Sequence, residues 1–169
     1  MTDGRDERDE RQQAQTLFLK AVRLVHMRRW RTAARALSEC AALRGDDADL
    51  MLLRSRCYME LGRHLDALPL LEQAVDRLSS RDMRRHQLAN ALADLGHCFR
   101  NAARGMDSAP RRLQREKALA AYRAAARMEP NDRDLRDSVR QLESALTPHD
   151  APPPAPTGPD DPPSKAELS

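Results

Sequence analysis

Three cysteines and five histidines are the side chains in this sequence best suited to nucleophilic or metal chemistry. His97 and Cys98 are neighbours, and a histidine near a cysteine can act as the base for a nucleophilic thiol. Adjacent side chains on a helix point about 100° apart, however, so these two would not share a proton easily. Cys40, Cys57 and Cys98 form no CxxC pair, and no histidine stands at metal-site spacing from two of them. We therefore predict that the cysteines are small buried helix residues.

Other catalytic patterns are missing from the sequence as well. It has no glycine-rich phosphate loop and no GxSxG nucleophile elbow. His26, His64 and His86 fall near expected helix ends, where a histidine usually caps the helix or contacts solvent. The odd number of cysteines argues against a disulfide framework. The sequence thus predicts no enzyme activity, no cofactor and no metal.

The formal net charge of +3 hides an uneven distribution along the chain. Residues 1–10 and 150–169 each carry −3, which leaves +9 for the segment between them. Almost all of that excess is arginine, since Lys20, Lys117 and Lys165 are the only lysines. A solvated basic surface and a preference for acidic partners both fit this pattern.

Nucleic-acid binding is the second functional hypothesis, because basic residues gather at two places in the sequence. The two groups are Arg81, Arg84 and Arg85, and Arg104, Arg111, Arg112, Arg115 and Lys117. Single-strand binders usually add aromatic side chains on which bases stack. The aromatic residues here are expected to lie mostly in the core: Phe18, Trp30, Tyr58, Phe99 and Tyr122. The sequence therefore disfavours nucleic acid as the partner.

The elements that position these residues are predicted to be helices. Alanine, leucine and arginine are abundant, and aromatic residues make up 3% of the chain. Apolar residues recur at helical spacing, interrupted about every 15 residues by short breaks. The breaks are Arg28–Arg29, Arg44–Asp47, Gly62–Arg63, Ser79–Arg81, Gly105–Pro110 and Glu129–Asn131. This pattern predicts an all-α chain of about seven helices.

The two ends of the sequence are predicted to be disordered. Residues 1–8 are charged, and residues 147–169 are rich in proline and poor in apolar side chains. No apolar stretch approaches the roughly 20 residues of a membrane span. The charged start does not look like a secretory signal, so we expect a cytoplasmic location.

A spacing of 34 residues relates the first four helices. It takes Ala33 to Ala67, Leu37 to Leu71 and Cys40 to Ala74. Further along, small, large and aromatic residues alternate in Leu92-x-x-Leu95-Gly96-x-x-Phe99 and in Ala118-x-x-x-Tyr122-x-x-Ala125, followed by Pro130. Together these motifs resemble the tetratricopeptide repeat, a helical hairpin that is stabilised by stacking on its neighbours.

The resemblance implies a tetratricopeptide solenoid at residues 9–146, wound as a right-handed superhelix. The repeats would span about 14–47, 48–81 and 89–132, the third with an insertion near 103–113. We expect its first helix to run long and a loop to follow at Gly105–Pro110. A capping helix at 132–146 would begin at Asn131 or Asp132 and carry an apolar stripe: Leu135, Val139, Leu142 and Leu146.

In this family the first helix of each repeat lines a concave groove, and that implies a set of candidate binding residues. The first repeat offers an apolar set: Phe18, Leu19, Val22 and Val25. The second offers Leu52, Leu53, Arg56, Met59 and Glu60, and the third Asn90, Ala93, Asp94, His97, Arg100 and Asn101. The groove should change from apolar to basic along the chain.

The predicted function is therefore an adaptor or chaperone that binds a peptide or helix of another protein. The clamp by which many tetratricopeptide co-chaperones hold a heat-shock protein is absent, since Phe18, Val22 and Leu53 stand at its positions. Type III secretion chaperones of the translocator class are similar in size and repeat number. Other hypotheses stay open: closure of the apolar groove by the chain's own N-terminal segment, a homodimer through the first repeat, or a structural subunit.

Overall fold

The computed structural model describes residues 3–79 and 84–147, and within them the chain is all-α, as predicted. Seven α-helices follow one another in the described residues. They are α1 Asp3–His26, α2 Trp30–Arg44, α3 Ala48–Glu60, α4 His64–Ser79, α5 Arg85–Ala102, α6 Ser108–Met128 and α7 Arg133–Leu146. A short 3-10 turn, Ala103–Gly105, lies between α5 and α6.

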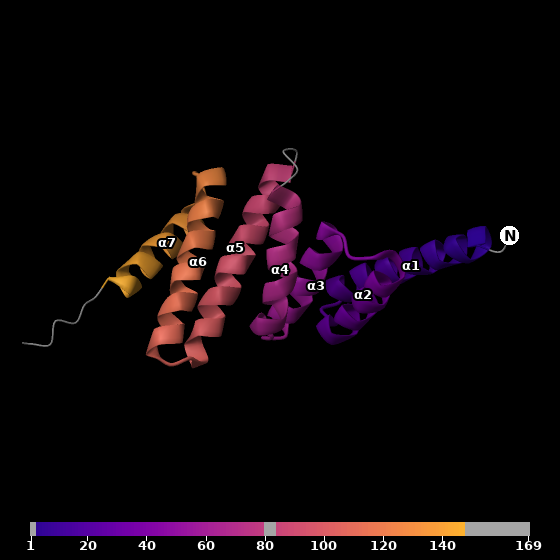
Figure 1. The fold of residues 1–169 in the computed structure, drawn as a ribbon, viewed down its shortest axis with the longest axis horizontal. Coiled ribbons are helices and arrows are strands. Elements are labelled where there is room, and N and C mark those ends of the chain that lie inside the picture. The colour runs from indigo at the N-terminus through magenta and orange to yellow at the C-terminus, as the bar shows by residue number, and fades with distance from the viewer. Residues whose placement is uncertain (1–2, 80–83, 148–169) are drawn as a thin grey trace, which may run out of the picture.

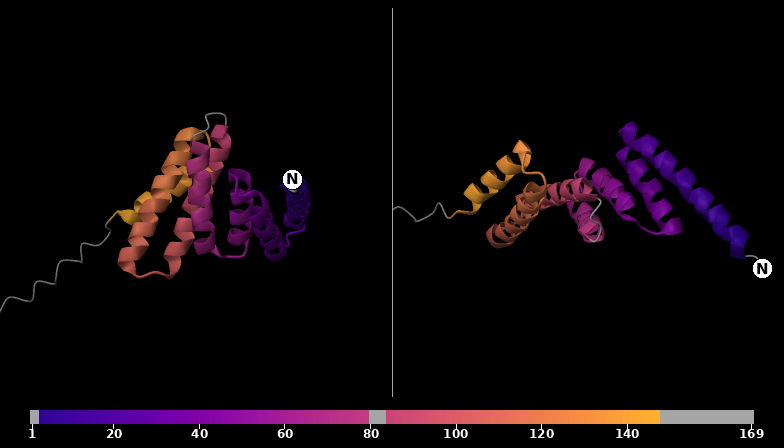
Figure 2. Two further views of the ribbon diagram at one scale, coloured as in Figure 1. Left: turned by 45° about the vertical axis from the view of Figure 1, so that its right-hand side comes forward. Right: turned by 90° about the horizontal axis from the view of Figure 1, so that it is seen from above.

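The helices pack as antiparallel hairpins in chain order. Hairpin one is α1–α2, hairpin two is α3–α4, hairpin three is α5–α6, and α7 packs on α6 at the end of the stack (Figure 1). Each helix touches mainly the helices before and after it in the chain, so α1 and α7 lie at opposite ends of an elongated body (Figures 1 and 2). In such a stack, the stability of each hairpin depends on its neighbours.

The 34-residue register predicted from the sequence is confirmed by burial. Ala33, Leu37 and Cys40 of α2 are 0% exposed. Their counterparts 34 residues later in α4, Ala67, Leu71 and Ala74, are also 0% exposed. In α6 the same pattern within the helix, a step of four residues and then of three, falls on Ala118, Tyr122 and Ala125, and all three are buried. The second helix of every hairpin thus presents the same face to the core.

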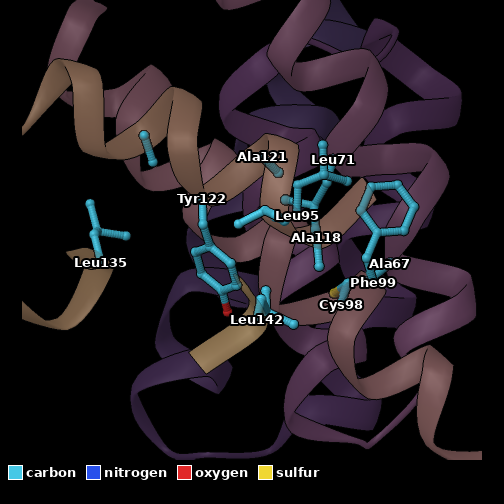
Figure 3. Packing of buried hydrophobic residues seen from close by; sticks show 12 residues of the cluster. Ala67, Leu71, Leu95, Cys98, Phe99, Ala118, Ala121, Tyr122, Leu135 and Leu142 are labelled. Atoms are coloured by element: carbon cyan, nitrogen blue, oxygen red, sulfur yellow. The ribbon is translucent and has the colours of Figure 1, made fainter. Parts of the chain in front are cut away.

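A small residue in the first helix of each hairpin lets the paired helix approach closely. Ala21, Ser55 and Gly96 hold this position, and all three are buried. The Ser55 hydroxyl donates to the Leu52 carbonyl at 2.8 Å, which satisfies its polar group inside the core. At Gly96 a Cβ atom would lie 3.0 Å from the Tyr122 ring. Figure 3 shows that ring within the apolar cluster that joins α5, α6 and α7.

The turns inside hairpins one and two also share one geometry at a spacing of 34 residues. Arg28 has a φ of 55° and Gly62 a φ of 72°, so both lie in the left-handed region. In each turn the next amide bonds the carbonyl five residues earlier: Arg29 N to Leu24 O and Arg63 N to Tyr58 O, both 2.8 Å. This is the usual way for a helix to end, with glycine as the favoured residue. Hairpin one uses an arginine there instead.

Aspartate side chains begin two of the helices. Asp47 accepts from the Leu50 amide at 2.8 Å at the start of α3, and Asp132 accepts from the Leu135 amide at 3.2 Å at the start of α7. A capping aspartate satisfies an amide that has no partner within the helix. Asp132 is thus the cap of the final helix, one of the two residues that the sequence offered.

Two expected boundaries were wrong. Helix α1 begins at Asp3, not at residue 9. The sequence has Asp3, Asp6 and Glu7 at its start, and acidic residues are favourable at a helix N-terminus. The loop expected at Gly105–Pro110 is shorter, because α6 starts at Ser108 and includes Pro110 in its first turn. Proline is tolerated there since the first amides of a helix have no intrahelical acceptor. The tail from residue 148 on lies outside the described residues.

The close approach at the small positions can be tested by overpacking. Gly96→Leu should lower the free energy of unfolding by about 1–3 kcal/mol, because the side chain would collide with Tyr122. Ala67→Leu, at a fully buried position, should have a similar effect. The measurement is urea denaturation followed by circular dichroism. Ala120→Leu on the exposed side of α6 is the matched control and should change little. An equal loss of unfolding free energy in all three variants would contradict the predicted repeat register.

The turn geometry predicts that Arg28→Gly stabilises the protein by up to about 1 kcal/mol. A side chain in the left-handed region is strained, and glycine removes that strain. The reciprocal change Gly62→Arg should destabilise, although nothing lies within 4 Å of its Cβ position, because the cost is in the backbone. Thermal melting of both variants checks the pair. A higher melting temperature for Gly62→Arg than for the wild type would overturn the explanation.

Candidate functional site

The apolar residues predicted for the groove of hairpin one lie mostly within a core. Phe18 and Val25 of α1 pack with Leu53 of α3 against the buried cluster of hairpins one and two, and all three are half-buried. The Arg44 guanidinium lies 4.9 Å from the centre of the Phe18 ring. Val22 is half-buried as well. The surface that these residues leave to a partner is therefore narrower than the sequence suggested.

Leu19 is the exception, since 52% of it is exposed. On α3, by contrast, Leu52 and Met59 are half-buried and pack against the cluster of hairpins two and three. The predicted apolar wall is thus divided between two cores, because α3 packs against both the preceding and the following hairpin. Arg56 of α3 is exposed.

The polar residues predicted on hairpin three are brought together on α5. The Arg100 Nη2 atom lies 3.4 Å from the His97 Nδ1 atom, and the Asn101 amide donates to the His97 carbonyl at 3.0 Å. Asp94 is half-buried one turn earlier. Burial raises the pKa of the Asp94 carboxyl, and the charge of Arg56 partly offsets this. Arg56 and Asp94 thus interact across the face that joins α3 to α5.

His64, which the sequence analysis did not include in the site, lies beside this group. Its ring meets that of His97 edge to face, with the centroids 5.7 Å apart. Burial lowers the pKa of His97, and Arg100, His64 and Arg104 lower it further. The pKa of His64 is lowered by burial and by Arg104. Both rings are therefore mainly neutral at neutral pH.

Cys98 lies near His64 across the α4–α5 contact, with Sγ 3.9 Å from the His64 Nδ1 atom. Burial raises the pKa of the Cys98 thiol to about 12, and Asp94 adds to the effect. A thiol with that pKa stays protonated at neutral pH and is a poor nucleophile. The sequence carried no signal for this proximity, because His64 begins the second helix of its hairpin and Cys98 lies in the first helix of the next, so the two are not at equivalent repeat positions.

A pocket of about 350 Å³ opens where the end of α5 and the start of α6 meet α7. Four guanidinium groups line it: Arg100, Arg104, Arg111 and Arg115. Its apolar wall consists of Ala103, Leu142 and Ala145, and Gln141 completes it. We call this the α5–α7 pocket. The sequence placed these arginines near an insertion but gave no sign that they converge.

No cluster of three or more histidine, cysteine or acidic side chains among the described residues could hold a metal ion. Within the same residues, every helix is too short or too polar to cross a membrane.

The two buried imidazoles predict a loss of stability in mild acid. In both rings the folded-state pKa lies below the unfolded value of 6.5, so the unfolded chain binds protons first as the pH falls through 6.5. His97→Gln should therefore reduce the fall in melting temperature between about pH 7.5 and about pH 5.5. Asp94 acts with the opposite sign, because its folded-state pKa is raised.

The matched control for this experiment is His26→Gln, at an exposed histidine at the end of α1. This variant should keep the wild-type pH dependence. The explanation fails if the melting temperatures of His97→Gln and His26→Gln fall by the same amount between the two pH values.

Comparison with known proteins identifies the fold. No family model matches the chain, and no curated protein matches its sequence. Among solved structures, the first TPR domain of Spaghetti (RPAP3), bound to the HSP90 peptide SRMEEVD, is similar with a TM-score of 0.63 and 18% identity. The match covers 80% of this chain and 94% of that one. The TPR domain of Arabidopsis OM64 also gives 0.63, with 15% identity, covering 80% of this chain and 98% of that one. Together with the hairpin register, these matches show that the chain has the tetratricopeptide-repeat fold, with three hairpins and a capping helix among its described residues.

Proposed function

We propose that this protein is an adaptor or chaperone that binds a peptide or helix of a partner protein along the face formed by α1, α3 and α5. The observation that carries the proposal is the change of side chains along this face. The exposed Leu19 lies at one end, the charged side chains of Arg56 and Asp94 in the middle, and His97, Arg100 and Asn101 at the other end. Such a surface suits a segment with an apolar part and an acidic part.

The fold likeness supports peptide binding in general. The first TPR domain of Spaghetti is bound to a peptide of HSP90, so a domain of similar fold binds a peptide of another protein. The residues at the clamp positions of this chain differ from those of a carboxylate clamp. Phe18, Val22 and Leu53 are apolar and half-buried, and none can donate a side-chain hydrogen bond. A partner other than a heat-shock protein is therefore proposed.

Binding without catalysis fits the chemistry of the face. The cysteine closest to a histidine is a protonated, buried thiol, so it offers no thiolate. The proposal accordingly needs no cofactor and no metal.

The packing of the aromatic rings disfavours nucleic acid as the partner. Cationic side chains of the same chain lie over four rings: Arg44 on Phe18, Arg63 on Tyr58, Arg100 on Tyr122 and Lys117 on Phe99. Tyr122 and Phe99 are also buried. Bases that needed to stack on these rings would have to displace the chain's own side chains.

The test is to select peptides from a displayed random library against the full chain and then to measure their affinity for variants. Leu19→Asp should weaken the selected peptides at least tenfold, about 1.4 kcal/mol, because burying an exposed leucine contributes roughly that much or more. Leu65→Asp is the matched control, since Leu65 is 63% exposed but lies on α4, a second helix. It should change the affinity less than about twofold.

Three results would count against this proposal. One is a library that yields no peptide, and another is equal weakening by the two aspartate variants. The third is loss of binding with Leu65→Asp alone, which would move the binding surface to the second helices. Circular dichroism of each variant shows that the helices remain formed.

A further inference from the structure

The α5–α7 pocket concentrates positive charge that the fold does not neutralise. Among the residues that the structure describes, no aspartate or glutamate lines it. Among the described residues, Arg104 and Arg115 have neither a hydrogen bond nor an ion pair. Arg111 donates only to a backbone carbonyl, that of Met106, from Nε at 2.9 Å and from Nη2 at 2.6 Å. Among the described residues, the one polar contact of the Arg100 side chain is that of its Nη2 atom with the His97 ring. Its Nε atom is buried and has no hydrogen-bond acceptor.

A second arginine-lined pocket between α6 and α7 shows how unusual this arrangement is within the molecule. That pocket also measures about 350 Å³ and is lined by Arg123, Arg127, Arg136 and Arg140. There the fold supplies carboxylates to two of the four arginines. Arg123 pairs with Glu143 at 2.6 Å, and Arg140 with Asp137 at 3.5 Å. The abundance of arginine alone therefore does not explain the unneutralised charge of the α5–α7 pocket.

The chemistry of the α5–α7 pocket indicates its ligand. Guanidinium groups bind carboxylates through short, charge-assisted hydrogen bonds. The aliphatic surface of Ala103, Leu142 and Ala145 would at the same time bury an apolar side chain. We propose that the α5–α7 pocket binds an acidic segment of a partner protein, in which an aliphatic residue is flanked by aspartate or glutamate.

The position of the pocket links it to the proposed peptide face. Arg100 belongs both to the polar end of α5 and to the pocket wall, so a segment that follows α1, α3 and α5 reaches the pocket at its end. The proposal rests in this respect on the proposed function and adds the charge of the bound segment. It places that charge away from Phe18, Val22 and Leu53, where the family's clamp would stand.

A peptide is favoured over a nucleic acid by the contents of the pocket. Among the described residues no aromatic side chain lines the pocket, and the Tyr122 ring, whose centre lies 5.8 Å from the Arg100 guanidinium carbon, is 4% exposed. The pocket therefore offers no open ring for stacking, whereas its aliphatic wall suits an amino-acid side chain.

The experiment measures fluorescence anisotropy of a labelled peptide in which one leucine is flanked on each side by two glutamates, added to the full chain. A peptide with glutamines in place of the glutamates is its control. Arg104→Gln with Arg115→Gln should weaken the acidic peptide at least tenfold, because two unpaired guanidinium groups are lost. Arg127→Gln with Arg136→Gln removes the same charge from the neighbouring pocket and should weaken it less than about twofold.

Two further arms identify other occupants. Inorganic phosphate and a short single-stranded DNA are titrated as competitors against the labelled peptide. The proposal is overturned if the DNA binds and the acidic peptide does not, or if both arginine pairs weaken the peptide equally, which would indicate diffuse attraction only. It is also overturned if the glutamine peptide binds as well as the acidic one, or if phosphate displaces the peptide at equal concentration.

The acidic residues at 148–169 could supply the ligand from within the chain. Full-length protein carrying Asp160→Asn and Asp161→Asn addresses this source. If the acidic peptide binds only to this variant, the occupant is the chain's own segment, and a partner segment is excluded. A negative result with the acidic peptide does not affect the test by library selection, because that test depends on Leu19, which lies on hairpin one. The two proposals can therefore fail separately.

Discussion

Close approach of the two helices in each hairpin is the constraint on which the structure depends. It needs a small residue in the first helix, Ala21, Ser55 or Gly96, and a matched large residue in the second. At Gly96 even one methyl group would press on the Tyr122 ring. The second helices bury the same pattern of three positions in each hairpin, and between hairpins one and two these positions are 34 residues apart.

Stacking of hairpins then decides how much of the first-helix face is left for a partner. A helix in the middle of the stack packs on both sides, and α3 shows the result: Leu53 joins the cluster of hairpins one and two, while Leu52 and Met59 join that of hairpins two and three. At the end of the stack α1 has hairpins on one side only, and Leu19 remains exposed there. Among the apolar residues predicted for the groove, Leu19 of the first hairpin is thus the one left exposed.

The distribution of carboxylates decides which arginines on the surface remain without a counter-charge. Ion pairs neutralise some arginines, such as Arg54 with Asp46 of the loop before α3 and Arg123 of α6 with Glu143 of α7. The arginines at the junction of α5, α6 and α7 receive no such partner from the described residues. Charged groups left without a counter-charge repel one another and remain available to an external anion. The α5–α7 pocket therefore carries positive charge at the end of the protein opposite Leu19.

The sequence alone determined the helices, the repeat length and the positions of small, large and aromatic residues. It could do so because apolar periodicity and residue size repeat along the chain. Ala33 and Ala67 could be matched by counting alone. The start of α6 at Ser108 was missed because a proline in a first turn resembles a loop in sequence. Only the tertiary structure placed His64 beside Cys98, covered Phe18 with Arg44 and gathered Arg104 and Arg115 into one pocket. These contacts depend on the angles between stacked helices, which arise from packing across hairpins and leave no periodic trace in the chain.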